Sequence, residues 1–359
     1  MLEKTIDAFR GHPFFLVALI LVMSLSSTRA DEKVEAGNSR NLTVEIAFAT
    51  NRQHKDTSDL SQRFGDEIGP LSFGTCSVKF TPVKFLKRAA RNIPIRFPTE
   101  KEDIVDLQQM DEEEFWFEVR QRVGSKGKKA VFYIHGYKMD FDKACRRAAL
   151  MQRELGSNVS VLLFAWPSQD NLAMYTRDET LLKKSVEDIA RVLDGMLETF
   201  GDGQVDVVGH SLGTRGVTSA IANLEQRGQV LFDELVLIAP DMDSHDFEDV
   251  LPHLSRAASG ITMYVSENDS PLRISREVHG EPRIGEAGEY LSLFDGVETI
   301  DISDFPQWDI YGHNYHYFNE HVIDDLRQLF IQGTRAAQRS GLEKKMRDGK
   351  HYWQSSALK

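Results

Sequence analysis

The 359-residue chain is poor in cysteine, has fewer basic than acidic residues, and lacks long apolar runs. With only Cys76 and Cys145, it carries neither a disulfide framework nor a zinc-type cysteine cluster. These two residues are equally compatible with one disulfide and with two buried thiols. The net charge of −12 gives the protein a field that repels phosphate groups, which argues against a nucleic-acid partner.

The first thirty residues have the features of a signal peptide. Lys4 and Arg10 precede the apolar run 14–23, and a Ser-rich stretch then ends at Ala30. The run is shorter than the roughly 20 residues of a membrane-spanning helix, although an uncleaved membrane anchor is the alternative. Residues 31–42 are polar and predict a tether. We therefore expect an exported protein, periplasmic or membrane-anchored, that faces outside the cytoplasm.

Residues 43–333 predict one α/β domain. Short apolar runs alternate with amphipathic helical stretches, and such runs are typical of strands that are buried on both faces. The clearest runs are 130–134, 159–166, 205–208, 235–239, 261–265 and 297–302. The alternation predicts a mostly parallel central sheet with helices on both faces, whose binding sites lie at the carboxyl ends of the strands.

Two charged stretches interrupt or follow this pattern. Residues 84–127 are rich in charge and predict a partly helical insertion before the catalytic core. Residues 334–359 carry seven Lys or Arg against two acidic residues, which predicts a basic, flexible tail.

The segment Gly209-His210-Ser211-Leu212-Gly213 lies between a predicted strand and a predicted helix. This context is that of a nucleophile elbow, in which a strained turn exposes the serine hydroxyl. Gly209 and Gly213 allow the strand and the helix to approach closely. A phosphate-binding turn is the alternative, but it needs further glycines or a lysine that do not follow here.

A second loop supports the same chemistry. His135-Gly136-Tyr137 follows a predicted apolar strand. In hydrolases with a nucleophile elbow, a loop in this place supplies the first oxyanion-hole donor. The predicted donors are the main-chain N–H groups of Tyr137 and Leu212. His135 is interpreted as a residue that shapes this loop.

Three residues near these motifs are candidates for the substrate pocket, namely His135, His210 and Trp166. Trp166 follows the strand run that begins at Val159. A rim position that caps the sheet is an equally good interpretation of Trp166.

A serine hydroxyl needs a histidine base, which in this fold follows the last strand. His313 occupies that place, and His316 is the alternative three residues on. The two histidines are not interpreted as metal ligands, because no further His or Cys cluster joins them. Asp269 and Asp241 each follow a predicted strand, and Asp269 is preferred as the acid that orients the base. The alternative for Asp241 is an N-cap or a loop-ordering carboxylate before the next predicted helix.

Taken together, several segments resemble a family of bacterial α/β-hydrolases of unknown function within the esterase and lipase superfamily. The matching segments are Phe48-Ala49-Thr50-Asn51-Arg52, Phe73-Gly74-Thr75-Cys76-Ser77-Val78, His135-Gly136-Tyr137, Phe164-Ala165-Trp166-Pro167-Ser168, Ala239-Pro240-Asp241, and Asp269 with Arg283-Ile284-Gly285. The resemblance implies the α/β-hydrolase fold, with Ser211 as nucleophile, Asp269 as acid and His313 as base. It implies no substrate. Cys145 and the acidic stretch before residue 129 depart from the family pattern.

The sequence thus predicts a serine hydrolase that cleaves a carboxylic ester and needs no cofactor or metal. Its expected partner is a small ester or acyl compound, with a possible membrane tether through the N-terminus. Acyltransferase, thioesterase and amidase activity use the same triad and stay open. A catalytically silent binding module of the cell envelope is the alternative from another class, and the intact set of Ser211, Asp269 and His313 argues against it.

Overall fold

The computed structural model describes residues 42–82, 100–124, 128–169, 174–225, 231–305 and 312–355. The chain divides into two compact units, residues 1–40 and 41–359, and all described residues belong to the second. The predicted signal peptide or anchor, and the tether up to residue 41, lie outside the described residues. Among the described helices, none is both long and apolar enough to cross a membrane.

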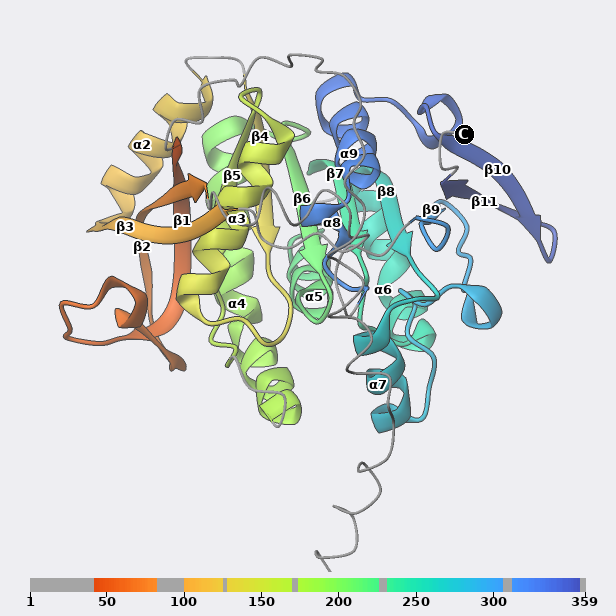
Figure 1. Ribbon diagram of the computed structural model, residues 1–359, viewed down its shortest axis with the longest axis horizontal. Coiled ribbons are helices and arrows are strands. Elements are labelled where there is room, and N and C mark those ends of the chain that lie inside the picture. The colour runs from red at the N-terminus through yellow and green to blue at the C-terminus, as the bar shows by residue number, and fades with distance from the viewer. Residues whose placement is uncertain are drawn as a thin grey trace, which may run out of the picture. The chain divides into compact units, whose positions relative to one another are not determined.

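The described part of the chain forms a sheet of eleven strands in the order β10-β11-β9-β8-β7-β6-β4-β5-β1-β2-β3 (Figure 1). The strands are β1 Leu42–His54, β2 Phe64–Pro82, β3 Glu100–Met110, β4 Lys129–Ile134, β5 Val159–Phe164, β6 Val205–His210, β7 Phe232–Ile238, β8 Ala258–Val265, β9 Glu298–Asp301, β10 Leu342–Arg347 and β11 Lys350–Ser355. In this sheet order, every neighbouring pair in the stretch β11-β9-β8-β7-β6-β4-β5-β1 is parallel. The remaining pairs, β1–β2, β2–β3 and β10–β11, are antiparallel. The predicted mostly parallel sheet is confirmed.

Helices cover both faces of this sheet (Figure 1). They are α2 Glu112–Gly124, α3 Phe141–Leu155, α4 Tyr175–Phe200, α5 Gly213–Leu224, α6 Ser244–Ala257, α7 Ser270–His279, α8 Tyr315–Phe318 and α9 Glu320–Gln332, with short 3-10 turns at Leu60–Gln62, Gly288–Tyr290 and Ala336–Gln338. Within β4, Phe132 and Ile134 join the core under α2, α4, α5 and α6, whereas Val131 and Tyr133 join the core under α3, α8 and α9. Burial of both faces explains the continuous apolar runs of the strands.

The order of the strands reverses at β4. The chain passes from β4 to β5 on one side, and β6 then pairs with the other side of β4. Parallel sheets open a crevice at such a point, outside the carboxyl ends of the strands. The fold therefore places the segments after β4 and β6 side by side.

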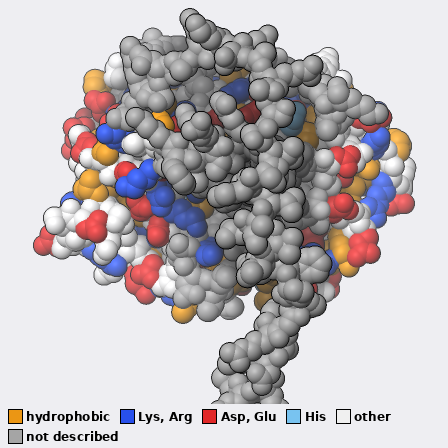
Figure 2. All heavy atoms as spheres, in the orientation of Figure 1, with side chains coloured by type: hydrophobic (Ala, Val, Ile, Leu, Met, Phe, Trp, Pro, Cys, Tyr) orange, Lys and Arg blue, Asp and Glu red, His pale blue; other side chains and the backbone are white. Residues whose placement is uncertain are grey.

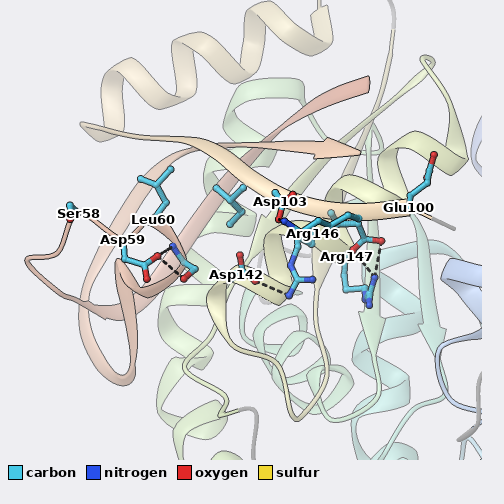
Figure 3. A pocket seen from close by; sticks show the side chains of 12 residues that line it. Ser58, Asp59, Leu60, Glu100, Asp103, Asp142, Arg146 and Arg147 are labelled. Carbon is cyan, nitrogen blue, oxygen red and sulfur yellow. Dashed lines mark hydrogen bonds and ion pairs between the residues drawn. The ribbon is translucent and has the colours of Figure 1, made fainter. Parts of the chain in front are cut away.

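The charged stretch 84–127 is not simply a helical insertion. Residues 100–110 form strand β3, which pairs with β2, and α2 buries Phe115 against the core. Two acidic residues of β3 pair with arginines of α3. Arg147, labelled in Figure 3, donates to Glu102 at 2.9 Å, and Arg153 donates to Glu100 at 2.5 Å. On the face seen in Figure 2, acidic and basic side chains are likewise interspersed among the described residues. The strand was missed because its cationic partners lie about fifty residues away in the sequence.

The prediction of a flexible tail is wrong for residues 334–355. β10 and β11 form a hairpin, and β11 pairs with β9. The tail is fixed by what we call the C-terminal ion cluster, which consists of Glu234, Glu298, Asp325, Arg335 and Arg339. Within it, Arg335 donates to Glu234 at 2.7 Å and the buried Arg339 donates to Asp325 at 2.9 Å. Some of the basic residues of the tail therefore form ion pairs with acidic residues of the domain.

The two cysteines form a disulfide between β2 and α3. Cys76 and Cys145 are fully buried, and their Cα atoms lie 6.5 Å apart. The structure thereby resolves the open choice between a disulfide and two thiols. It also explains Cys145, whose position in α3 departs from the family pattern.

Candidate active site

Ser211 lies in a strained turn between β6 and α5. Its φ of +53° is in the left-handed region, which is unfavourable for a residue with a Cβ atom. Its main-chain N–H donates to the carbonyl of Ile238 at 2.9 Å, and its carbonyl accepts from the N–H of Asp241 at 3.2 Å. The end of β7 and the loop after it therefore hold the turn.

The glycines around Ser211 lie where a side chain would not fit. A Cβ atom at Gly213 would lie 2.4 Å from the carbonyl oxygen of His135, and one at Gly209 would lie 2.9 Å from Val217. Both contacts are shorter than van der Waals distance. The predicted reason for glycine at the two positions, close approach of strand and helix, thus matches the packing.

The loop after β4 packs directly against the serine. A Cβ atom at Gly136 would lie 2.7 Å from the Cβ atom of Ser211. Leu212 is the N-cap residue of α5, where main-chain N–H groups have no partner within the helix. Tyr137 and Leu212, the expected oxyanion donors, therefore belong to two segments that meet at Ser211.

His135 and Trp166 support this loop from within the core. Both side chains are fully buried, and their rings stack at 5.3 Å. The indole N–H of Trp166 donates to the carbonyl of His135 at 2.7 Å. Burial lowers the pKa of His135 to about 3, so that its ring is neutral at physiological pH. The structure thus gives Trp166 a buried contact with the loop in place of a rim position.

His313 and Asp269 meet at the same end of the sheet. His313 follows β9 in the chain, and Asp269 follows β8 as the N-cap of α7. Nδ1 of His313 donates to the Asp269 carboxylate, at 2.7 Å from Oδ2 and 2.9 Å from Oδ1. Asp269 is 2% exposed and His313 is 9% exposed, so water screens this pair little. Because Nδ1 carries the proton, Nε2 of neutral His313 is left as an acceptor.

Asp241, the alternative acid, makes a different set of contacts. Its carboxylate accepts from the hydroxyls of Tyr175 and Ser275, each at 2.6 Å. Arg215 also donates to it at 3.4 Å. The helix-capping alternative does not describe it either, because Asp243 is the N-cap of α6. The structure brings Asp269, and not Asp241, to the His313 ring.

The comparison with protein families fits this geometry. Residues 109–332, more than half of the chain, match the family described as an alpha/beta hydrolase of unknown function (DUF900). The chain belongs to this family. The predicted resemblance and the α/β-hydrolase fold are thereby confirmed. The segments 48–52 and 73–78, which also resembled the family, lie before the matched range.

Several solved structures are similar to this chain at low sequence identity. The putative cell surface hydrolase from Lactobacillus plantarum is 14% identical, with 58% of this chain and 93% of that chain covered and a TM-score of 0.38. The Pyrobaculum calidifontis esterase is 14% identical, with coverage of 57% and 77% and a TM-score of 0.35. Carboxylesterase CesB from Bacillus subtilis is 9% identical, with coverage of 73% and 89% and a TM-score of 0.33. No curated protein matches this chain.

Two further histidines of this α/β-hydrolase lie beside His313. Nε2 of His210 donates to the main-chain carbonyl of His313 at 3.2 Å, which links the serine turn to the segment of the base. The ring of His316 packs on His210 at 4.4 Å. Burial lowers the pKa values of His210 and His316 well below the usual range, and neighbouring histidines lower them further. Both rings are therefore neutral and buried.

The described residues contain no group of three or more His, Cys, Asp or Glu side chains that could hold a metal ion. The chemistry must be judged from the residues around Ser211. Among them, sequence reasoning gave no separate role to Arg52, a buried arginine within β1. The available signal was an arginine that follows the apolar strand segment Ile46–Ala49 at a distance of three residues.

Proposed function

We propose that this α/β-hydrolase is a serine esterase with Ser211 as nucleophile, His313 as base and Asp269 as orienting acid. The observation that carries the proposal is the strained turn of Ser211 at the same sheet end as the buried His313–Asp269 pair. A left-handed serine is costly and persists where the position of its hydroxyl has a use. Family membership supports a hydrolase but supplies no substrate.

In the proposed reaction, Oγ of Ser211 attacks the ester carbonyl carbon while its proton passes to Nε2 of His313. The N–H groups of Tyr137 and Leu212 stabilise the negative oxygen of the tetrahedral intermediate. Collapse of this intermediate breaks the ester bond, and the alcohol leaves with the proton from His313. Water then attacks the acyl-enzyme by the same steps and releases the acid and free Ser211.

Asp269 acts through His313. Its carboxylate accepts from Nδ1, which fixes the tautomer whose Nε2 can take a proton. The carboxylate also stabilises the imidazolium that forms when the proton arrives. This interaction is stronger in a buried site than in water.

The test is labelling of the purified protein with a fluorophosphonate, together with turnover of p-nitrophenyl esters of different chain length. We expect labelling and turnover in the wild type and in the control variant Ser219→Ala. Ser219 lies in α5, the helix that follows the turn of Ser211. Labelling and turnover should both disappear in Ser211→Ala and His313→Ala. A folded wild type without labelling would refute the proposal and favour the silent binding module.

Product analysis separates the alternatives that share the acyl-enzyme. Transfer of the acyl group to an added alcohol in preference to water would indicate an acyltransferase. Higher kcat/KM for thioesters or amides than for esters would indicate a thioesterase or an amidase. Each of these outcomes keeps Ser211 and changes only the acceptor or the bond.

We also propose that the protein is exported, through cleavage after Ala30 or as a membrane-anchored form. The signal-like sequence supports this location, and so does the disulfide between Cys76 and Cys145, since such bonds persist in oxidising compartments. Fractionation of expressing cells, with mass spectrometry of the N-terminus, tests it. An intact Met1 in a cytoplasmic fraction would contradict both forms.

A further inference from the structure

Arg52 is a charged side chain in a fully enclosed place. It is 1% exposed and lies within β1, close to the strand end that carries the site. Burial lowers its pKa to about 10, against the opposing effect of Asp140, Asp178 and Asp66, so it is still a cation at neutral pH. Burying a cation is costly unless its donors are satisfied. The hydrogen-bond partners of Arg52 therefore indicate which part of the structure the buried cation stabilises.

The guanidinium of Arg52 donates to three main-chain carbonyls from three different segments. Nη2 donates to Met139 in the loop after β4 at 2.6 Å. Nη1 donates to Ser168 in the loop after β5 and to Gly65 in β2, both at 3.0 Å. The planar fork of arginine suits several fixed acceptors, which a lysine ammonium cannot reproduce.

Both main-chain polar groups of Met139 are hydrogen-bonded. Its carbonyl accepts from Arg52, and its N–H donates to Oγ of Ser168 at 3.2 Å. Oγ of Ser168 in turn donates to the buried Asp178 at 2.6 Å. Arg52, Ser168 and Asp178 thus form one network around Met139, which binds both main-chain polar groups of this residue in the loop after β4.

The residue before Met139 is strained. Lys138 has a φ of +60°, a left-handed conformation that costs roughly 1–2 kcal/mol for a residue with a Cβ atom. Such strain persists where surrounding contacts over-determine it. Lys138 directly follows Tyr137, whose N–H is the proposed oxyanion donor. The strained turn therefore sets the course of the chain at the donor.

We infer that Arg52 is a positioning residue for the oxyanion hole. Its hydrogen bond to Met139 stabilises the strained turn at Lys138 and thereby fixes the peptide N–H of Tyr137 beside Ser211. Arg52 touches no reacting atom, and it acts through the loop alone. The inference rests on the proposed function, since it assigns Arg52 a part in that reaction.

The variant Arg52→Lys tests the inference, and Ser168→Ala provides a milder change in the same network. The matched control is Arg339→Lys, another buried arginine, which belongs to the C-terminal ion cluster. The measurements are kcat and KM for a p-nitrophenyl ester, the pH–rate profile, the melting temperature, and hydrogen exchange of peptides that cover residues 135–140.

Removal of an oxyanion donor costs about 100- to 1,000-fold in kcat, so displacement of one should cost about 10- to 100-fold. We expect this loss in Arg52→Lys and a smaller loss in Ser168→Ala. In both variants KM and the midpoint of the pH–rate profile should stay within about twofold and about 0.3 pH units of the wild type, because the charge state of His313 is untouched. Exchange in residues 135–140 should rise. Arg339→Lys should lower the melting temperature with no change in kcat or in this exchange.

Three results would overturn the role of Arg52. The first is an unchanged kcat in a folded Arg52→Lys. The second is an equal loss of kcat in Arg339→Lys when the two variants have the same melting temperature. The third is hydrogen exchange in residues 135–140 of Arg52→Lys that stays at the wild-type rate. If Arg52→Lys does not fold, the same criteria apply to Ser168→Ala. Failure of the proposed function has another signature, because the wild type itself would then lack turnover that depends on Ser211.

Discussion

The candidate active site and the C-terminal ion cluster both bury polar groups, but they balance charge in opposite ways. In the ion cluster, each acid has a cation from a distant segment, as in the pair of Asp325 and Arg339. At the active site, the buried histidines are neutral because burial lowers their pKa values. The first region pairs its acids with arginines and serves the fold. In the second, the proposed reaction would create charges that the resting site does not hold.

The largest expected effect follows from an acid in the active site. We expect Asp269→Asn to lower kcat by about 1,000- to 10,000-fold, because the amide cannot orient His313 or stabilise its imidazolium. The melting temperature should change little. Ester turnover measures this loss, and Asp241→Asn is the comparison, since the Asp241 carboxylate contacts Tyr175 and Ser275. Equal losses in the two variants would show that the geometry does not decide the acid.

The corresponding substitution in the ion cluster should act on stability. Asp325→Asn removes the charge that faces the buried Arg339, and we expect the free energy of unfolding to fall by about 3 kcal/mol. kcat should stay at the wild-type level below the melting temperature. Urea unfolding and ester turnover of the same sample measure both quantities. A loss of kcat without a loss of stability would break the distinction between the two regions.

The neutral histidines predict a loss of stability in acid. Because the folded-state pKa values of His135, His210 and His316 are lowered, the unfolded chain takes up protons that the folded chain excludes. The stability that the neutral histidines contribute is fully present above about pH 6.5. Below it, the free energy of unfolding falls by about 1.4 kcal/mol per pH unit for each histidine. His316→Phe should reduce this slope. Urea unfolding between pH 4.5 and 7 measures it, and an equal slope in the variant would argue against a neutral buried His316.

Two buried carboxylates, Glu234 of the ion cluster and Asp206 beside it, predict the opposite trend. Burial raises the pKa of Asp206 to about 8 and that of Glu234 to about 7. The folded chain then holds protons that the unfolded chain releases above about pH 4, so stability falls as the pH rises toward these values. Asp206→Asn should flatten the decline between pH 6 and 8 by about 1 kcal/mol per pH unit. Thermal unfolding over this range measures it, and an unchanged decline would assign it to other groups.

The extent of sequence-based prediction also differs between the two regions. The turn at Ser211 and the loop at Gly136 were predictable because each is a local pattern of a few residues at a strand end. Asp269 was preferred over Asp241 from its place after a strand, whereas its contact with His313 spans 44 residues of chain and is visible only in the structure. The ordered C-terminal segment was missed because Arg335 and Arg339 resemble residues of a solvated tail until Glu234 and Asp325 are known to lie beside them.

The left-handed conformation of Ser211 also bears on how the protein can change over time. Glycine adopts this conformation without the strain that a Cβ atom causes, so Ser211→Gly should raise stability by about 1 kcal/mol and remove the hydroxyl. One substitution therefore separates the present chain from a more stable and inert one. Random drift in a lineage that no longer used the reaction would favour the glycine. Under the proposed function, retention of the serine at this backbone angle costs stability, and the reaction at Ser211 offsets that cost.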